Sequence, residues 1–134
     1  MIGLDTNVLA RYLLDDDRAQ SAQARKAIFT QLDRGETLMM CAAMFLELEW
    51  VLRSRPGLNK SNVIAMLRGL TEVRELVIDG DDCVVEALYT YENTNVDFAE
   101  CLFYSIYRRR GCDAILSFDR RAQKALQGCV APQV

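Results

Sequence analysis

Short apolar runs alternate along this chain with longer stretches in which apolar residues recur at helical spacing. The runs predict strands at residues 1–4, 37–41, 74–78 and 114–118. The longer stretches predict a helix beginning at residue 6 and others at about 18–33, 42–53, 59–70, 81–91, 97–109 and 119–126. Strands that alternate with helices pair in parallel. The pattern therefore predicts an α/β fold, a three-layer α/β/α sandwich with a mostly parallel central sheet.

Capping signals and core stripes refine the helices. Asp15, Asp16 and Asp17 precede the second helix, and we interpret them as an N-cap and a solvated turn. One side of that helix carries Ala22, Arg25, Phe29 and Leu32. The sides expected to pack inward in two later helices carry Phe45, Leu48, Val51 and Leu52, and Phe98, Leu102 and Ile106.

Length and composition indicate one domain over residues 1–134. With 51% hydrophobic and 26% charged residues, 134 residues can bury one core but are too few for two ordinary domains. The first residues have no basic segment, and Asp5 interrupts their apolar run, so we expect neither a signal peptide nor a membrane span. The five cysteines have no C-x-x-C pair and are interpreted as reduced, buried thiols. A cytoplasmic protein is expected.

The absence of histidine narrows the possible chemistry. With no histidine in the chain, imidazole acid–base catalysis and Ser-His or Cys-His nucleophiles are excluded. The formal charge of -3 argues against a large electrostatic contribution to nucleic-acid affinity, but a carboxylate cluster that binds cations also counts as negative. Hydrolysis by this chain would therefore depend on carboxylates, most plausibly with a metal ion.

Two aspartates follow predicted strands at opposite ends of the chain. Asp5 ends the first apolar run and Asp119 ends the last. Functional groups gather at the carboxyl ends of the strands in open parallel sheets, which makes both candidate site residues. The alternative is that each simply caps the helix that follows.

The helices at 42–53 and 97–109 offer further carboxylates. Glu47 and Glu49 are two positions apart, about 200° around a helix, so only one can face a site; Glu47 lies beside the core stripe, and we interpret Glu49 as a solvent-facing charge. Asp97 and Glu100 share one face, where they either form a solvated first turn or are bridged by a cation. Carboxylates from four segments are typical of a Mg²⁺ or Mn²⁺ site for phosphoryl chemistry.

Four segments resemble motifs of PIN-domain ribonucleases, in particular VapC toxins. MIGLDTNVLARYLL resembles the opening of these toxins, and ELEWVL, VDFAECL and ILSFDRRA are similar to their E-x-x-W-V-L, D-F-A-D-A-L and T-F-D-R-R-A motifs, in the same order. The resemblance implies an acidic metal-binding and catalytic set of Asp5, Glu47, Glu100 and Asp119, with Glu47 selected by its spacing to Trp50. It further implies supporting roles for Asn7 and Ser117, and places Asp97 as a second carboxylate and possible metal ligand beside the site.

Position 100 departs from the family pattern, which has aspartate where this chain has glutamate. The extra methylene can displace a ligand oxygen by more than an octahedral Mg²⁺ site tolerates, so either Glu100 or Asp97 can be the main third ligand. A catalytically weakened PIN domain that binds RNA or a partner is therefore an alternative. A receiver-like signalling module is a weaker rival, because it needs adjacent acids after the first strand and a lysine late in the sheet.

The resemblance also implies partners. It predicts endoribonuclease activity on transfer or ribosomal RNA, a homodimer, and inhibition by a cognate VapB-like antitoxin, for which Tyr12, Leu13 and Leu14 offer an apolar groove or simply pack in the core. The basic residues near two of the acids either contact RNA phosphates or, at 108–110, form a solvated helix C-terminus. They are Arg108, Arg109, Arg110, Arg120, Arg121 and Lys124.

Overall fold

The structure is a computed structural model, and it describes residues 1–133. The chain forms two compact units, Met1–Asp81 and a second that begins at Asp82. Helices and strands alternate along the described residues, and every strand pairing among them is parallel, as the sequence pattern predicts.

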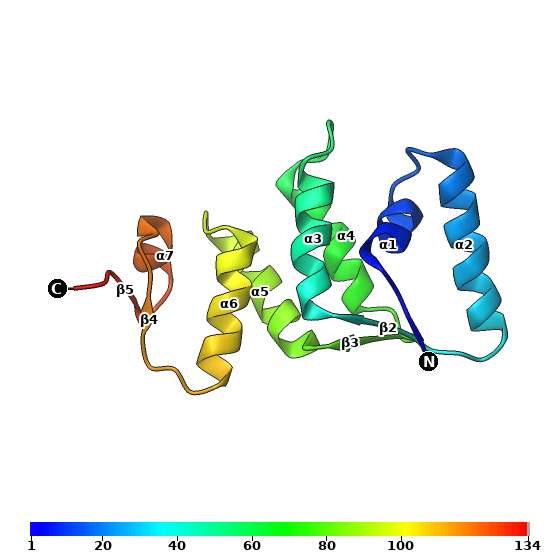
Figure 1. The fold of residues 1–134 in the computed structure, drawn as a ribbon. Helices are drawn as coiled ribbons and strands as arrows, with labels where there is room; N and C mark the ends of the chain where they lie inside the picture. Colours follow the sequence, from blue (N-terminus) through cyan, green and yellow to red (C-terminus); the bar gives the residue numbers. More distant parts are fainter. Residues whose placement is uncertain (134) are drawn as a thin grey trace. The chain divides into compact units, whose positions relative to one another are not determined.

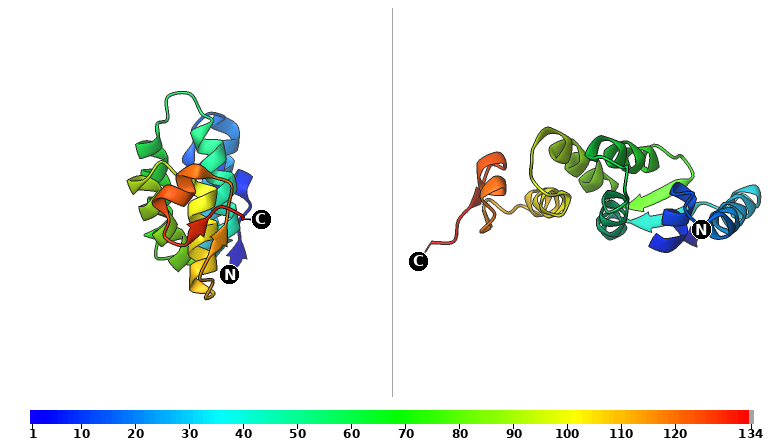
Figure 2. Two further views of the ribbon diagram at one scale, coloured as in Figure 1. Left: turned by 90° about the vertical axis from the view of Figure 1, so that its left-hand side faces the viewer. Right: turned by 90° about the horizontal axis from the view of Figure 1, so that it is seen from above.

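The first unit is built around a three-stranded sheet with the order β1-β2-β3. Leu38 lies opposite Ile2 on one side and Leu76 on the other. The right-hand view in Figure 2 shows the arrows of β2 and β3 side by side and pointing the same way. Along the chain the elements of this unit are β1 (Ile2–Gly3), α1 (Thr6–Leu13), α2 (Arg18–Asp33), β2 (Leu38–Cys41), α3 (Ala42–Arg53), α4 (Lys60–Thr71) and β3 (Leu76–Asp79).

The core of this unit lies between one face of the sheet and its helices. Because the strand order follows the chain order and parallel crossovers are right-handed, both crossovers pass over the same face of the sheet. Figure 1 shows α1, α3 and α4 on one side of the strands. The buried strand residues alternate accordingly: Leu38, Met40, Leu76 and Ile78 are buried, whereas Val77 is exposed. From the helices, Phe45, Leu48, Leu52, Val63 and Leu67 are fully buried.

The side of α2 that carries Ala22, Arg25 and Phe29 is not its buried side. The buried residues of this helix are Ser21, Ala24 and Ile28, while Ala22 and Arg25 are exposed and Phe29 is 51% exposed. Ser21 can face inward because its hydroxyl donates to the Leu14 carbonyl oxygen at 2.9 Å, which satisfies the buried polar group. A pattern based on apolar residues alone passes over such a serine. The N-cap prediction is confirmed, since Asp17 accepts a hydrogen bond from the Gln20 backbone N–H.

Helix α5 (Asp81–Asn93) begins one residue before the second unit. The further elements of this unit are α6 (Phe98–Arg109), β4 (Ile115–Leu116), α7 (Arg120–Ala125) and β5 (Cys129–Val130). The rings of Tyr91 in α5 and Phe98 in α6 lie 5.5 Å apart between centroids. Strands β4 and β5 pair in a sheet of their own. Sequence analysis missed β5, because two residues are too few to show alternation.

Two further expectations can be compared with the described residues. All five cysteines are free thiols, but the prediction that they are buried is wrong for Cys112, which is exposed, and holds fully for Cys101 and Cys129. In the part of the chain that the structure describes, no helix combines the length and apolar character needed to cross a membrane.

Candidate metal centre

Three of the predicted acidic residues occupy N-cap positions, but only one of them acts as a cap. Asp119 accepts a hydrogen bond through Oδ1 from the Ala122 backbone N–H at 3.0 Å and so caps α7. Asp5 precedes α1 and Asp97 precedes α6, and neither side chain makes a capping hydrogen bond within the described residues. Capping therefore accounts for Asp119, whereas the carboxylates of Asp5 and Asp97 are left free for another role.

Asp5 and Glu47 belong to the first unit. The Leu4 backbone N–H donates to the Met39 carbonyl oxygen at 2.9 Å, so Asp5 stands directly where the chain leaves the parallel sheet. The neighbouring strand β2 runs into α3, whose second turn carries Glu47, and α1 packs against α3. The side chains of Asp5 and Glu47 are both exposed to solvent.

The structure corrects the interpretation of Glu49. Rather than facing solvent, Glu49 is only 5% exposed, and its Oε1 accepts a hydrogen bond from Arg53 Nε at 2.8 Å. The other member of the pair, Glu47, is exposed. A buried carboxylate needs a donor or a cation, and an arginine one turn further along the helix supplies both. The geometry leaves Glu47 as the glutamate of α3 that is open to a ligand.

In the second unit, Glu100 and Asp119 both lie close enough to Cys129 to act on its thiol. Burial raises the pKa of the Cys129 thiol, and the negative charges of Glu100 and Asp119 raise it further, against a lowering contribution from a hydrogen bond with Ser117. A cavity of about 180 Å³ is lined by Glu100, Ser117 and Cys129, together with aromatic residues of α6. Both carboxylates are half-buried. Glu100 of α6 and Asp119 before α7 thus both act on the same thiol.

Ser117, one of the two supporting residues, forms a hydrogen bond with an acid of the predicted set. Its Oγ accepts a hydrogen bond from the Asp119 backbone N–H at 3.0 Å, and its backbone carbonyl oxygen accepts one from Gln123 Nε2 at 2.7 Å. Ser117 therefore holds the turn that presents Asp119. Within residues 1–133, Asn7 makes no hydrogen bond to Asp5; it lines a groove between α1 and α2 with Arg11 and Gln23.

The predicted ligand set is divided between the two units. Asp5 and Glu47 lie in the first, whereas Asp97, Glu100 and Asp119 lie in the second. Among the residues that the structure describes, no three acidic or cysteine side chains are gathered closely enough to hold a metal ion. Within the second unit, Glu100 and Asp119 both lie near Cys129.

The basic residues differ in what they contact. Arg108 Nη1 donates to the backbone carbonyl oxygens of Cys112 and Asp113 at 3.1 and 3.2 Å. Arg109 pairs with Glu86, at 3.2 Å, and with Asp82, at 3.7 Å. These contacts hold the end of α6 in place, which supports a structural role for these two arginines. Arg120, Arg121 and Lys124 project from α7 and are exposed.

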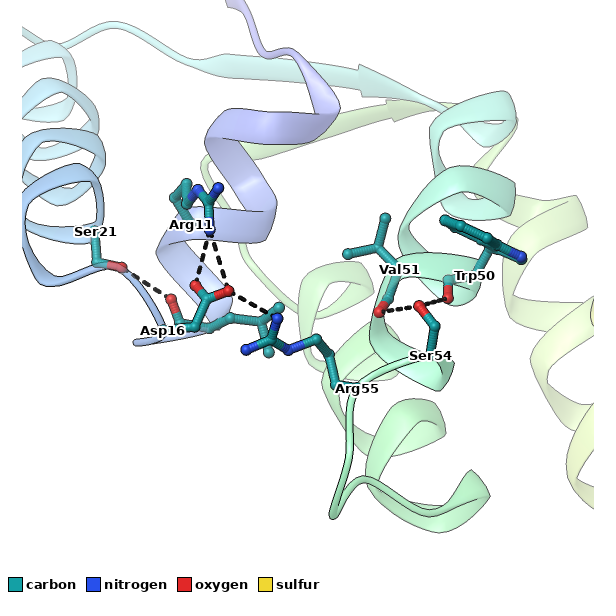
Figure 3. Close-up of polar contacts among 8 residues, drawn as sticks. Arg11, Asp16, Ser21, Trp50, Val51, Ser54 and Arg55 are labelled. Carbon is teal, nitrogen blue, oxygen red and sulfur yellow. Dashed lines mark hydrogen bonds and ion pairs between the residues drawn. The ribbon is translucent and has the colours of Figure 1, made fainter.

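Sequence analysis missed one charged cluster, shown in Figure 3. Arg11 Nη1 lies 3.0 and 3.1 Å from the two carboxylate oxygens of Asp16, and Arg55 Nη1 lies 3.1 Å from Oδ2 of the same residue. Burial by itself raises the pKa of Asp16, but the Arg11 hydrogen bond and the Arg55 charge outweigh it and lower the pKa below its ordinary value. Asp16 thereby joins the loop after α1 to the loop after α3. The turn is exposed, as the sequence predicts, but Asp16 is also held there by two ion pairs that no local pattern indicated.

Comparison with known proteins places these observations in a family. The sequence model of the PIN-domain family matches residues 2–126 of this chain. This chain belongs to the PIN-domain family. The match includes every predicted acidic position in both units, and it identifies the alternating helices and parallel strands as an α/β PIN-like fold. PIN domains are commonly metal-dependent nucleases that bind nucleic acid. A search of curated proteins gives no match to this PIN domain.

Proposed function

We propose that this PIN domain is an endoribonuclease that hydrolyses RNA with a divalent cation, and that it is the VapC toxin of a toxin–antitoxin pair. The observation that carries the proposal is Asp5: its carboxylate stands at the carboxyl end of β1 and is not used to cap α1. The PIN-domain match covers this residue and the other three acids. We further propose that residues 1–134 act as one functional domain, although the described residues divide into two compact units.

The donor chemistry suits Mg²⁺ or Mn²⁺. Asp5, Glu47, Glu100 and Asp119 offer only carboxylate oxygens, the hard ligands that these cations prefer, and no histidine competes as a ligand for softer metals. Asp97 supplies a further carboxylate beside Glu100 at the start of α6. A divalent cation bound by these residues would activate a water molecule and neutralise the charge that develops on the phosphate. Transfer or ribosomal RNA is the proposed substrate class.

Other residues support binding and orientation in this proposal. Ser117 holds the backbone of Asp119, so it positions one ligand without contacting the metal. Arg120 and Arg121 are exposed on α7, beside Asp119, where guanidinium groups can contact RNA phosphates. Arg108 and Arg109 are less suited to that role because their guanidinium groups already bind carbonyl and carboxylate oxygens.

An antitoxin and a second copy of the chain are the proposed protein partners. In the first unit, an apolar cavity of about 80 Å³ is lined by Tyr12, Leu9, Phe29 and Val73 among others. Phe29 and Val73 remain 51% and 41% exposed, so the cavity opens to a partly apolar surface. That surface supports docking of an apolar helix face there. Leu13 and Leu14 are half-buried and do not line the cavity.

The proposal is tested by cleavage of a mixed RNA pool with Mg²⁺ or Mn²⁺, with EDTA as the metal-free control. Wild-type protein is expected to cut only with the metal, and Asp5→Asn is expected not to cut. Asp33→Asn is the matched control, because it makes the same change at an exposed residue of α2 outside the predicted set. Cleavage that survives Asp5→Asn, or that Asp33→Asn also abolishes, contradicts the proposed site.

The departure at position 100 favours one second candidate, a PIN domain that binds RNA or a partner with weakened catalysis. Calorimetric titration of the folded protein with Mn²⁺ distinguishes the two. The nuclease is expected to bind Mn²⁺ through Asp5, whereas a binding module keeps its fold and its RNA affinity without measurable metal binding.

A further inference from the structure

Aromatic side chains line the cavity that Glu100 shares with β4. The cavity has a volume of about 180 Å³. It is lined by Phe103, Tyr104 and Tyr107 from α6, and by Leu116 and Ser117. Phe103 and Tyr107 are 39% and 45% exposed, and they lie four residues apart, on neighbouring turns of one helix face. The opposite side of α6 carries its buried residues, including Leu102 and Ser105. These two rings are therefore not part of the core of the second unit.

The walls of this cavity are held by hydrogen bonds within the second unit. The Tyr104 hydroxyl donates to the Gln127 carbonyl oxygen at 2.6 Å, which joins α6 to the loop after α7. Arg108 Nη1 joins the same helix to the carbonyl oxygens of Cys112 and Asp113. The cavity thus has fixed sides, and a flat ligand can enter it without reorganising the surrounding residues.

We propose that this cavity holds one unpaired nucleobase of single-stranded RNA, with Tyr107 and Phe103 as its stacking surface. This inference rests on the proposed function and adds a specificity subsite to it. Unstacked bases are recognised by aromatic side chains together with hydrogen bonds to their polar edges. Here the rings provide the surface, and Ser117 and Tyr107, whose side chains carry hydroxyl groups, belong to the lining.

Size and charge favour a base over a whole nucleotide or a free phosphate. Pockets for drug-sized ligands have volumes of roughly 300 to 1,000 Å³. The volume of this cavity is smaller, so a single ring system fits it better than a base with its sugar and phosphate. Glu100 lines the cavity and, among the described residues, no lysine or arginine does, which disfavours an anion there. The exposed arginines of α7 offer separate contacts for the flanking phosphates. A base bound beside Glu100 would select which phosphate of the strand lies at the acidic residues.

The test measures binding in EDTA, so that cleavage does not deplete the RNA. Fluorescence anisotropy compares short single-stranded oligoribonucleotides with abasic ribose-phosphate oligomers of the same length, using wild type, Tyr107→Leu and Tyr107→Phe. Wild type is expected to prefer the oligomer with bases, and Tyr107→Leu to reduce that preference about 5- to 150-fold, equivalent to about 1–3 kcal/mol per stacked base. Tyr107→Phe retains the ring and is expected to retain the preference.

Two controls keep the outcomes distinct. Thermal unfolding of Tyr107→Leu shows whether the variant is folded, and Phe103→Leu replaces a second ring if it is not. Equal weakening of both oligomers by Tyr107→Leu overturns the inference, because the ring would then not contact a base. If Tyr107→Leu keeps the wild-type preference for oligomers with bases, the inference is also overturned. Sedimentation shows whether that variant has instead lost self-association, in which case Tyr107 belongs to an interface between copies of the chain.

Failure of this inference differs from failure of the proposed function. Metal- and Asp5-dependent cleavage without any effect of Tyr107→Leu on base preference leaves the nuclease and removes the base subsite. A base preference that depends on Tyr107, with no cleavage in either metal, leaves the subsite in an RNA-binding PIN domain.

Discussion

Glu49 accepts a hydrogen bond from Arg53 one turn further along α3, with 2.8 Å between Oε1 and Nε. The glutamate side chain is 7% exposed, whereas that of the arginine is 57% exposed. The pair therefore places a carboxylate in the protein interior and its cation at the surface. Glu47 lies on the same helix but is exposed, so the two glutamates should respond differently to the same substitution.

We predict that Glu49→Gln lowers the free energy of unfolding by about 1 kcal/mol, because glutamine keeps an oxygen that can accept from Arg53 but loses the negative charge that strengthens the hydrogen bond. Glu47→Gln should change it by less than about 0.5 kcal/mol, as expected of an exposed side chain, and should abolish cleavage. Urea unfolding and RNA cleavage measure the two effects. Loss of cleavage in Glu49→Gln at unchanged stability would contradict the assignment of Glu47.

The ion pairs of Asp16 should make stability depend on pH. The pKa of Asp16 is lowered in the folded protein, so its contribution to stability is present above the ordinary aspartate pKa, about 4, and is lost as the pH falls through the lower folded value. Asp16→Asn should therefore unfold at lower urea than wild type at neutral pH, with the difference narrowing below about pH 4. Asp15→Asn, an exposed neighbour, is the matched control. A difference that stays constant with pH would rule out the charge as its cause.

Asp119 combines a capping role with a proposed ligand role, and two substitutions separate them. Asp119→Asn keeps the oxygen that accepts from Ala122, whereas Asp119→Ala removes it. Asp119→Ala should lower the unfolding free energy by about 1 kcal/mol, and Asp119→Asn should be close to wild type. Both should fail to cut RNA. Normal cleavage by Asp119→Asn would exclude this residue from the metal site.

Metal binding should stabilise the folded protein independently of any RNA. At a Mn²⁺ concentration 100 times the dissociation constant, the expected gain is about 2.7 kcal/mol. Asp5→Asn should lose this gain without losing stability in EDTA, because the Asp5 side chain does not cap α1 within the described residues. Thermal unfolding with and without Mn²⁺ measures it. An equal gain in Asp5→Asn would show that the cation binds elsewhere.

The role of Glu100 as a metal ligand can be tested by replacing it with aspartate, the residue that the PIN-domain motif has at this position. If Asp97 shares coordination because Glu100 is longer, Asp97→Asn should weaken Mn²⁺ binding about 10- to 100-fold in the wild-type background. The same substitution should have a smaller effect in the Glu100→Asp background. Calorimetry on the four proteins of this cycle gives the coupling between the two residues. Additive effects would show that Asp97 does not compensate for the length of Glu100, and the absence of any weakening by Asp97→Asn would place Asp97 outside the metal site.

Much of the secondary structure follows from local sequence signals. The bounds of α2 and α3 agree with the prediction, because capping residues and helical periodicity lie within a few residues of each helix end. The positions of Asp5 and Asp119 at the starts of helices follow for the same reason. That these aspartates differ in capping does not follow, since it depends on the side-chain torsions adopted in the folded chain.

The sequence by itself determined the α/β class, the order of the elements, the family motifs and the candidate acids, because these depend on residues close together in the chain. Only the tertiary structure decided that Glu49 is buried against Arg53, that Ser21 faces inward in α2, and that Asp16 binds Arg55. Each of these outcomes depends on which polar group finds a partner once the elements pack. Residues as far apart as Asp16 and Arg55 meet only after the chain has folded, so no local pattern specifies their contact.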